Sequence, residues 1–164
     1  MITVIRHATE HDLPQIRTVA ESTGIFLGDE LSTFVHEMAQ LLSASSPITP
    51  TATLLVASDG EGADAPVAGV AYFAPEVMAQ GVMNLLFIGV HPDARNHGVG
   101  GALIESFENA ARSAGARLAI IETASDEMFA PAWALYTKAG YSEEARVRDY
   151  YDDGLHKLIF RKRF

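Results

Sequence analysis

Residues 90–101 read VHPDARNHGVGG and join a strongly apolar segment to an amphipathic one. The apolar segment, residues 82–90, reads VMNLLFIGV, which predicts a central strand with apolar residues on both faces. After the glycines, apolar residues recur at helical spacing until Gly115, which stands where a C-terminal capping glycine would. The stretch therefore predicts a strand, a short loop and a glycine-rich turn that opens a helix.

The glycine-rich turn has the chemistry of a phosphate site. The N-terminus of a helix carries unpaired N–H groups and a partial positive charge. Glycines allow a phosphate to approach the backbone closely. Arg95 adds a positive charge that is kept at physiological pH. We therefore expect this turn to hold a pyrophosphate.

Two common phosphate motifs fit the turn less well. A Walker P-loop ends in Gly-Lys-Ser/Thr, and the turn has no lysine. The Rossmann fingerprint G-x-G-x-x-G/A matches Gly98 and Gly100, but Leu103 stands at its last position. Glu122 follows at about the distance of the ribose-binding acid in that fingerprint. A nucleotide-dependent oxidoreductase that binds NAD therefore stays an alternative.

The third pattern, R/Q-x-x-G-x-G/A after a strand that ends Val-x-Pro, matches residues 90–100 fully. On these residues the chain resembles the GNAT superfamily of N-acetyltransferases. The resemblance implies acetyl-CoA as the cofactor and an amine as the acceptor. It also implies that backbone N–H groups hold the pyrophosphate and that the strand end carries the pantetheine arm. The implied cofactor-binding residues are Ile88, Gly89, Val90, Arg95, Asn96, His97, Gly98, Val99, Gly100 and Gly101.

The order of the predicted elements extends this resemblance over nearly the whole chain, which we expect to be a single domain over residues 1–164. The implied fold is α/β, with a mixed, mostly antiparallel sheet of about seven strands and about four flanking helices. Its central parallel pair, 82–90 and 117–123, splays to admit the thioester. The other predicted strands are 3–7, 53–58, 67–73, 142–150 and 156–163. The helices begin near residues 13, 31, 99 and 131, with a loop at 43–51 and a hairpin turn at 59–66.

Residues 133–141 carry a second signature, WALYTKAGY. It resembles the late family motif L-Y-x-K-x-G-F/Y, and the resemblance implies that Tyr136 faces the thiol and donates to the leaving thiolate. The alternative is that Trp133 and Tyr136 are core residues. The family often has an asparagine where this chain has Phe129, so a hydrogen bond to the pantetheine arm is missing or supplied otherwise.

The catalytic base is harder to assign. Some family members carry a glutamate on the central strand, but the counterpart here is Asn84, which cannot accept the proton. Glu122 on the adjacent strand is the candidate, and its alternative role is a cap or an ion pair. His91 and His97 also titrate nearby, although each fits a solvated loop residue. A water chain without a dedicated base stays open.

Composition narrows the function classes. The formal charge of −9 disfavours nucleic acid as a partner. The chain has no cysteine, which excludes disulfides, thiolate metal sites and a cysteine nucleophile, and we expect no metal. No signal-peptide pattern and no membrane-length apolar run is found, so we expect a cytoplasmic protein without a membrane partner. A homodimer is compatible with the sequence.

The leading hypothesis is an N-acetyltransferase in which the amine attacks acetyl-CoA directly in a ternary complex. The alternative is an acyl-CoA-binding regulatory module that has lost catalysis. The acceptor, a small-molecule or peptide amine, is not specified by a motif. Residues 148–154 resemble the late hairpin that borders the acceptor site, or form a plain surface turn. Aromatic candidates for lining an acceptor pocket, each of which could equally be core, are Phe26, Tyr72, Phe73, Tyr150 and Tyr151.

Overall fold

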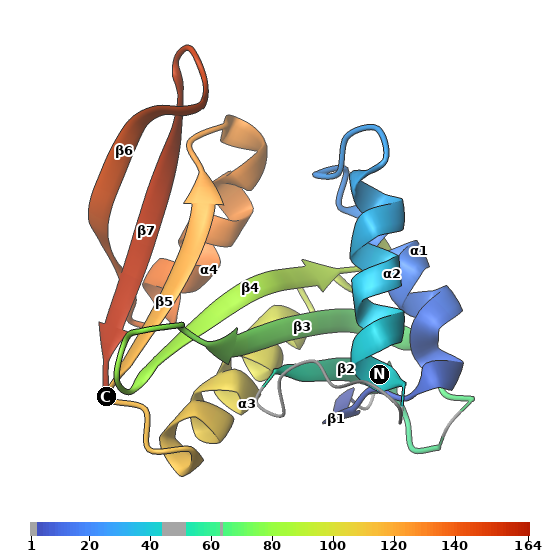
Figure 1. The fold of residues 1–164 in the computed structure, drawn as a ribbon. Coiled ribbons are helices and arrows are strands. Elements are labelled where there is room, and N and C mark those ends of the chain that lie inside the picture. Colours follow the sequence, from blue (N-terminus) through green and yellow to red (C-terminus); the bar gives the residue numbers. More distant parts are fainter. Residues whose placement is uncertain (1–2, 44–51, 63) are drawn as a thin grey trace. The chain divides into compact units, whose positions relative to one another are not determined.

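The computed structural model describes residues 3–43, 52–62 and 64–164 (Figure 1). The strands are β1 (Thr3–His7), β2 (Thr53–Asp59), β3 (Val67–Pro75), β4 (Val82–Val90), β5 (Leu118–Ala124), β6 (Ser142–Asp152) and β7 (Leu155–Arg163). The α-helices are α1 (Leu13–Ser22), α2 (Glu30–Leu42), α3 (Val99–Ser113) and α4 (Ala130–Lys138). The element order is the predicted one. Of the predicted loop at 43–51, all but Ser43 lies outside the described residues.

The strands form a seven-stranded sheet in the order β1-β2-β3-β4-β5-β7-β6. Among the described registers, β4–β5 is parallel and the other pairs are antiparallel. The predicted mixed α/β sheet with a central parallel pair and four helices is thus confirmed. A Rossmann domain needs a mostly parallel sheet, so the NAD-binding alternative is wrong.

The contacts divide the chain into two compact units. The first unit comprises Met1–Phe73 and Phe87–Ser106, and the second comprises Ala74–Leu86 and Phe107–Phe164. The elements β3, β4 and α3 contribute residues to both. The single domain over 1–164 stays a prediction.

In the first unit, α1 and α2 lie side by side on one face of the sheet (Figure 1). Their apolar stripes pack on Leu54 and Val56, which alternate along β2, and on residues of β3, whose register with β2 shifts at Ala57/Ser58. The buried cluster comprises Ile16, Val19, Ala20, Phe34, Met38, Leu54, Val56, Val67, Val70 and Phe87. The two helices predicted to begin near residues 13 and 31 are confirmed, and this cluster forms their buried face.

The start of α3 packs on the opposite face at Gly69 of β3. A Cβ atom added at Gly69 would lie 3.0 Å from side-chain atoms of both Val99 and Leu103, and 3.1 Å from the carbonyl oxygen of Gly89. These distances are tighter than ordinary contacts, so a glycine here lets the helix sit close to the strand. The glycine-rich turn is thereby fixed against the sheet.

In the second unit, α4 packs on β5 and β7. The indole Nε1 of Trp133 donates to the carbonyl of Ala124 at 3.2 Å. Lys162 of β7 donates to both carboxylate oxygens of Glu108, at 2.7 and 2.8 Å, and to the carbonyl of Ala139 at 2.7 Å. One ammonium group therefore ties β7 to α3 and to the end of α4.

Two local predictions need correction. The strand β4 is not buried along its whole length, because Leu86 is 50 % exposed. The described pairing with β5 runs from Val82–Leu118 to Leu85–Ile121 and ends before Leu86. Three short 3-10 helices, Glu10–Asp12, Pro92–Ala94 and Glu127–Phe129, were not predicted because three residues are too few to show a period. The splay beyond Leu86 stays a prediction.

A buried ion pair links β1 to α1. The Arg6 guanidinium donates to both oxygens of Asp12, at 2.8 and 2.7 Å, and the Asp12 side chain is fully buried. The Thr9 N–H also donates to this carboxylate at 2.7 Å, and with the Thr9 side chain it forms the capping box that the spacing Thr9-x-x-Asp12 indicates. Burial alone would raise the pKa of Asp12, but the hydrogen bonds from Arg6 and Thr9 outweigh it, and the pKa is lowered.

We expect Asp12→Ala to lower the free energy of unfolding by about 3–5 kcal/mol, because it leaves the Arg6 charge without its partner. Since the pKa of Asp12 is lowered in the folded state, its stabilisation is present above the unfolded pKa of about 3.9 and is lost as pH falls through the folded value. Urea unfolding between neutral and acidic pH measures both effects. Asp64→Ala, in an exposed turn, is the control. An Asp12 variant as stable as this control would contradict the assignment.

Candidate functional site

The turn between β4 and α3 has an unusual backbone. Pro92–Ala94 form a 3-10 turn, with Ala94 buried as an anchor. Asn96 and Gly98 then adopt positive φ angles of 62° and 83°. A left-handed residue is tolerated by glycine and asparagine better than by most others. These two residues reverse the chain so that α3 begins at Val99.

The N–H groups that follow are free to bind a ligand. In the described part of the chain, no backbone N–H from Asn96 to Gly101 donates a hydrogen bond, and the first donor of the helix is Ala102, to the carbonyl of Gly98 at 3.0 Å. The positive end of the α3 dipole lies at the same place. A run of unpaired donors at a helix start suits a phosphate group.

The charged and titratable side chains of the turn fit this reading. The guanidinium of Arg95 forms no ion pair with any described carboxylate, and its Nε donates to the carbonyl of Val90 at 3.3 Å. The ring of His97 lies 2.8 Å from the carbonyl of Arg95, and the ring of His91 accepts from the N–H of Asp93 at 3.4 Å. Both histidine rings form contacts within the turn itself, which is typical of loop residues.

Glycines leave room at the turn. A Cβ atom at Gly98 or Gly101 would have no neighbour within 4 Å. Packing therefore does not explain Gly101, which costs about 1 kcal/mol in a helix relative to alanine. At Gly89 a Cβ would lie 2.8 Å from the ring of Phe87 and 3.0 Å from Thr23. The open surface, free donors and Arg95 together fit a bound pyrophosphate.

Tyr136 lies on α4 in the second unit. It is 4 % exposed, and its ring contacts that of Phe160, with centroids 5.4 Å apart. Its hydroxyl donates to no other described residue. Burial raises the pKa of Tyr136, so the phenol is protonated throughout the neutral range. It can therefore act as a donor but not as a base.

Glu122 lies on β5 in the same unit and is held in an ion pair with Lys157 of β7. The Lys157 ammonium also lies 4.7 Å from the ring centroid of Tyr150, and Glu122 and Tyr151 act on each other electrostatically. Although desolvation opposes it, the pairing with Glu122 raises the pKa of Lys157. One of the two roles considered for Glu122, an ion pair, is thus observed.

Asn84 is buried in β4, and its amide donates to the Glu76 carboxylate at 2.9 Å. The amide oxygen of Asn84 has no partner among the described residues. This residue cannot accept a proton as a carboxylate would. Glu76 lies at the end of β3 and is a carboxylate that sequence reasoning did not consider.

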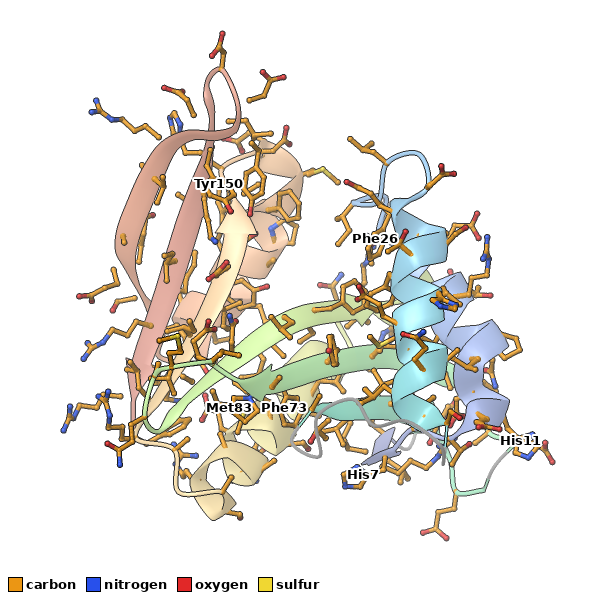
Figure 2. The ribbon with its side chains drawn as sticks, viewed as in Figure 1. His7, His11, Phe26, Phe73, Met83 and Tyr150 are labelled. Atoms are coloured by element: carbon orange, nitrogen blue, oxygen red, sulfur yellow. The ribbon has the colours of Figure 1, made fainter. Side chains whose placement is uncertain are left out.

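Of the aromatic pocket candidates, Phe26 lines a groove and Phe73, 1 % exposed, belongs to the core. Tyr72 is half-buried, whereas Tyr150 and Tyr151 are 54 % and 49 % exposed and contact each other. Figure 2 shows Phe26 beside the N-terminal half of α2. The groove has a volume of about 420 Å³ and is lined by Phe26, Asp29, Glu30, Thr33, Phe34 and Glu37.

Sequence reasoning missed this groove. A signal was present, because Asp29, Thr33 and Glu37 recur every four residues on one face of the predicted helix. They were overlooked because a polar helix face is ordinarily solvated.

Other site types find no support in the described residues. No group of three or more His, Asp or Glu residues there could hold a metal ion. No helix there combines the length and hydropathy that a membrane span requires.

Comparison with known families finds one match. The model of the Acetyltransferase (GNAT) family aligns with residues 21–141. That range includes the phosphate turn, Glu122 and Tyr136. Comparison with curated protein sequences finds no significant match.

Solved structures share the fold over its whole length. A GNAT-family protein from Desulfovibrio desulfuricans is 27 % identical, covers 99 % of both chains and has a TM-score of 0.88. The ribosomal-protein-S18-alanine N-acetyltransferase of Escherichia coli is 20 % identical, with a TM-score of 0.75 over 99 % of this chain and 94 % of its own. A Salmonella typhimurium protein solved with its cofactor acetyl-CoA is 17 % identical, with the same coverages and a TM-score of 0.73.

We expect Gly101→Asp to weaken CoA binding by roughly tenfold or more without unfolding the protein. The Cβ atom enters open space, and a carboxylate in the first turn of a helix favours its dipole. The same negative charge repels a pyrophosphate held by the neighbouring N–H groups. Calorimetric titration with CoA measures the affinity, and thermal melting measures the stability.

Gly101→Asn is the matched control, because it has the same shape without the charge. It should bind CoA more tightly than the aspartate variant. Equal affinities for wild type and Gly101→Asp would show that the turn does not hold the pyrophosphate.

Proposed function

The chain belongs to the GNAT family of acetyltransferases, and from that membership we propose that it transfers an acetyl group from acetyl-CoA to the nitrogen of an amine. The observation that carries this proposal is the run of unpaired N–H groups from Asn96 to Gly101 beside the unpaired charge of Arg95. We further propose that transfer occurs by direct attack in a ternary complex. We also propose that the partner is an amine and not a nucleic acid, and that the protein is cytoplasmic.

Acetyl-CoA supplies an activated acetyl thioester. The chain must bind it, accept a proton from the attacking amine and stabilise the leaving sulfur. Arg95 and the N–H groups of Asn96–Gly101 would bind the pyrophosphate, while Ile88, Gly89 and Val90 would bind the pantetheine arm. The N–H of Val90 would donate to the thioester carbonyl oxygen as charge develops there. In the balanced reaction the C–N bond forms, the C–S bond breaks, and the proton lost by the amine is matched by one gained by sulfur.

Tyr136 would serve the leaving sulfur. Its raised pKa keeps the hydroxyl protonated, which is the state that a donor needs. A free thiol has a pKa of about 8.5, below that of the phenol, so the main effect would be a hydrogen bond that stabilises the thiolate. The ring contact with Phe160 would fix the direction of that hydrogen bond.

The amine must lose a proton, and Glu122 is the proposed acceptor. Because its carboxylate is paired with Lys157, it would act through a water or after the pair opens. The pairing also favours the second candidate, a CoA-binding module with little catalysis, since no free carboxylate base is in evidence at β5.

The direct test is release of free thiol from acetyl-CoA in the presence of a panel of amines. We expect amine-dependent thiol release, with intersecting lines when both substrates are varied. The chain has no cysteine, which is the commonest nucleophile of a covalent acyl-enzyme, and this favours a ternary complex. Parallel lines or a trapped acyl-enzyme would contradict direct attack. Tight CoA binding with no thiol release would favour the module.

We expect Tyr136→Phe to lower kcat by roughly 10²–10⁴-fold with little change in acetyl-CoA affinity. The substitution removes one hydroxyl and keeps the ring that packs on Phe160. Steady-state turnover and calorimetric titration on the same preparation separate the two quantities. Tyr141→Phe is the control, since it removes another buried hydroxyl of the second unit. Near-wild-type turnover in Tyr136→Phe would remove Tyr136 from the mechanism.

A further inference from the structure

We propose that the preferred acceptor is an aliphatic amine with an apolar chain and a second positive charge, held by the groove along α2. The proposal rests on the proposed N-acetyl transfer and names the substrate class of the same site. The groove belongs entirely to the first unit.

The floor of the groove is aromatic. Phe26 and Phe34 lie with ring centroids 5.1 Å apart, and Phe87 of β4 lies 5.7 and 4.8 Å from them. These three rings form one apolar cluster, in which Phe26 and Phe34 line the groove and the buried Phe87 packs against them. Such a surface favours hydrocarbon over a fully polar ligand, at about 25 cal/mol per Å² of apolar area buried.

The rim of the groove is acidic. Asp29, Glu30 and Glu37 supply three carboxylates, and the lining includes no lysine or arginine among the described residues. Glu30 already accepts the N–H of Leu27 at 2.7 Å, whereas Asp29 and Glu37 form no ion pair within the described part of the chain. An aromatic floor with an unpaired acidic rim is complementary to a cation on an apolar chain.

The two unpaired carboxylates extend along the groove. Asp29 and Glu37 are eight residues apart on one helix face, which corresponds to about 12 Å at 1.5 Å per residue. The ring of Tyr72 is half-buried, and burial together with the negative charge of Glu37 raises its pKa, so the carboxylate lies near that hydroxyl. The negative potential therefore covers a length suited to an extended cation.

The floor also leads to the strand end that would carry the thioester. Phe87 and Gly89 are on the same face of β4, and the Phe87 ring lies over the position where a Gly89 side chain would be. Phe87, which is buried under the groove, thus connects its aromatic rings to the neighbourhood of Gly89. The reacting nitrogen must be neutral when it attacks, so the charge that the rim attracts is a second one.

Helix stability explains part of the acidic rim, but not all of it. Asp29 and Glu30 stand at the N-terminus of α2, where carboxylates favour the helix dipole. Glu37 lies in the middle of the helix and gains nothing from the dipole. A substitution at Glu37 therefore tests ligand binding without changing the interaction of a carboxylate with the helix dipole.

The test compares aliphatic diamines of four to twelve carbons with monoamines and ω-amino acids of the same length. For each compound, kcat/KM is measured from thiol release. The value for a diamine is divided by two, because either of its two amino groups can react. An exposed carboxylate contributes a factor of about two to five to the binding of a cation. We expect the diamine to exceed the monoamine by at least that factor at the best length, and the amino acid to fall below the monoamine.

Glu37→Gln should lower the diamine preference by about two- to fivefold, because the monoamine has no second charge for this carboxylate to bind. Glu61→Gln, in the exposed turn after β2, makes the same change in net charge and should leave the preference intact. Salt at about 1 M, where the Debye length is about 3 Å, should also remove most of the preference. Titration of the diamine into the protein without acetyl-CoA provides a readout independent of catalysis.

The outcomes separate the two proposals. Acetylation of amines with equal kcat/KM for diamine and monoamine, or a preference unchanged in Glu37→Gln, overturns the inference and leaves the proposed function standing. No thiol release with any amine counts against the proposed function. In that case, diamine binding that weakens in Glu37→Gln supports the groove assignment, and its absence overturns it.

Discussion

The unpaired N–H groups from Asn96 to Gly101 are the feature on which the rest of the molecule depends. Peptide donors normally find partners, and a helix leaves its first few free only at its end. Here the free run is lengthened by a turn with positive φ at Asn96 and Gly98. The close approach of α3 to Gly69 then holds the turn against β3. The donors are in place before any ligand arrives, so binding does not have to order them.

In the second unit, the packing around α4 fixes the orientation of the buried Tyr136 side chain. Tyr136 lies two residues before the end of α4, and that end is fixed because Lys162 donates to the Ala139 carbonyl and to Glu108. Removing either partner of this pair would leave the other charge partly buried without its partner. The ring contact with Phe160 completes the support.

Ion pairs and grooves show where sequence reasoning reached its limit. Glu122 and Lys157 are far apart in the chain, and no local pattern joins them; the register of β5 and β7 brings them together. Leu86 reads as a core residue in an apolar run, yet it is half-exposed because the described pairing with β5 ends just before it. The two aromatic rings of the groove along α2 likewise pack against Phe87, a residue from a strand far along the chain.

The sequence by itself determined the element order and the glycine-rich turn that opens α3, because each rests on residues that are neighbours in the chain, whereas the mixed sheet was implied by the family resemblance. A left-handed glycine, a helix start and a period of apolar residues are local properties, and residues 90–101 carry the glycines and the helix start of the turn. Only the tertiary structure decided that Glu122 is paired, that Phe73 is core while Phe26 lines a groove, and that Glu37 stands unpaired on its rim. Those outcomes depend on which side chains meet across strands and helices, and that is fixed by packing between distant segments and not by spacing within one.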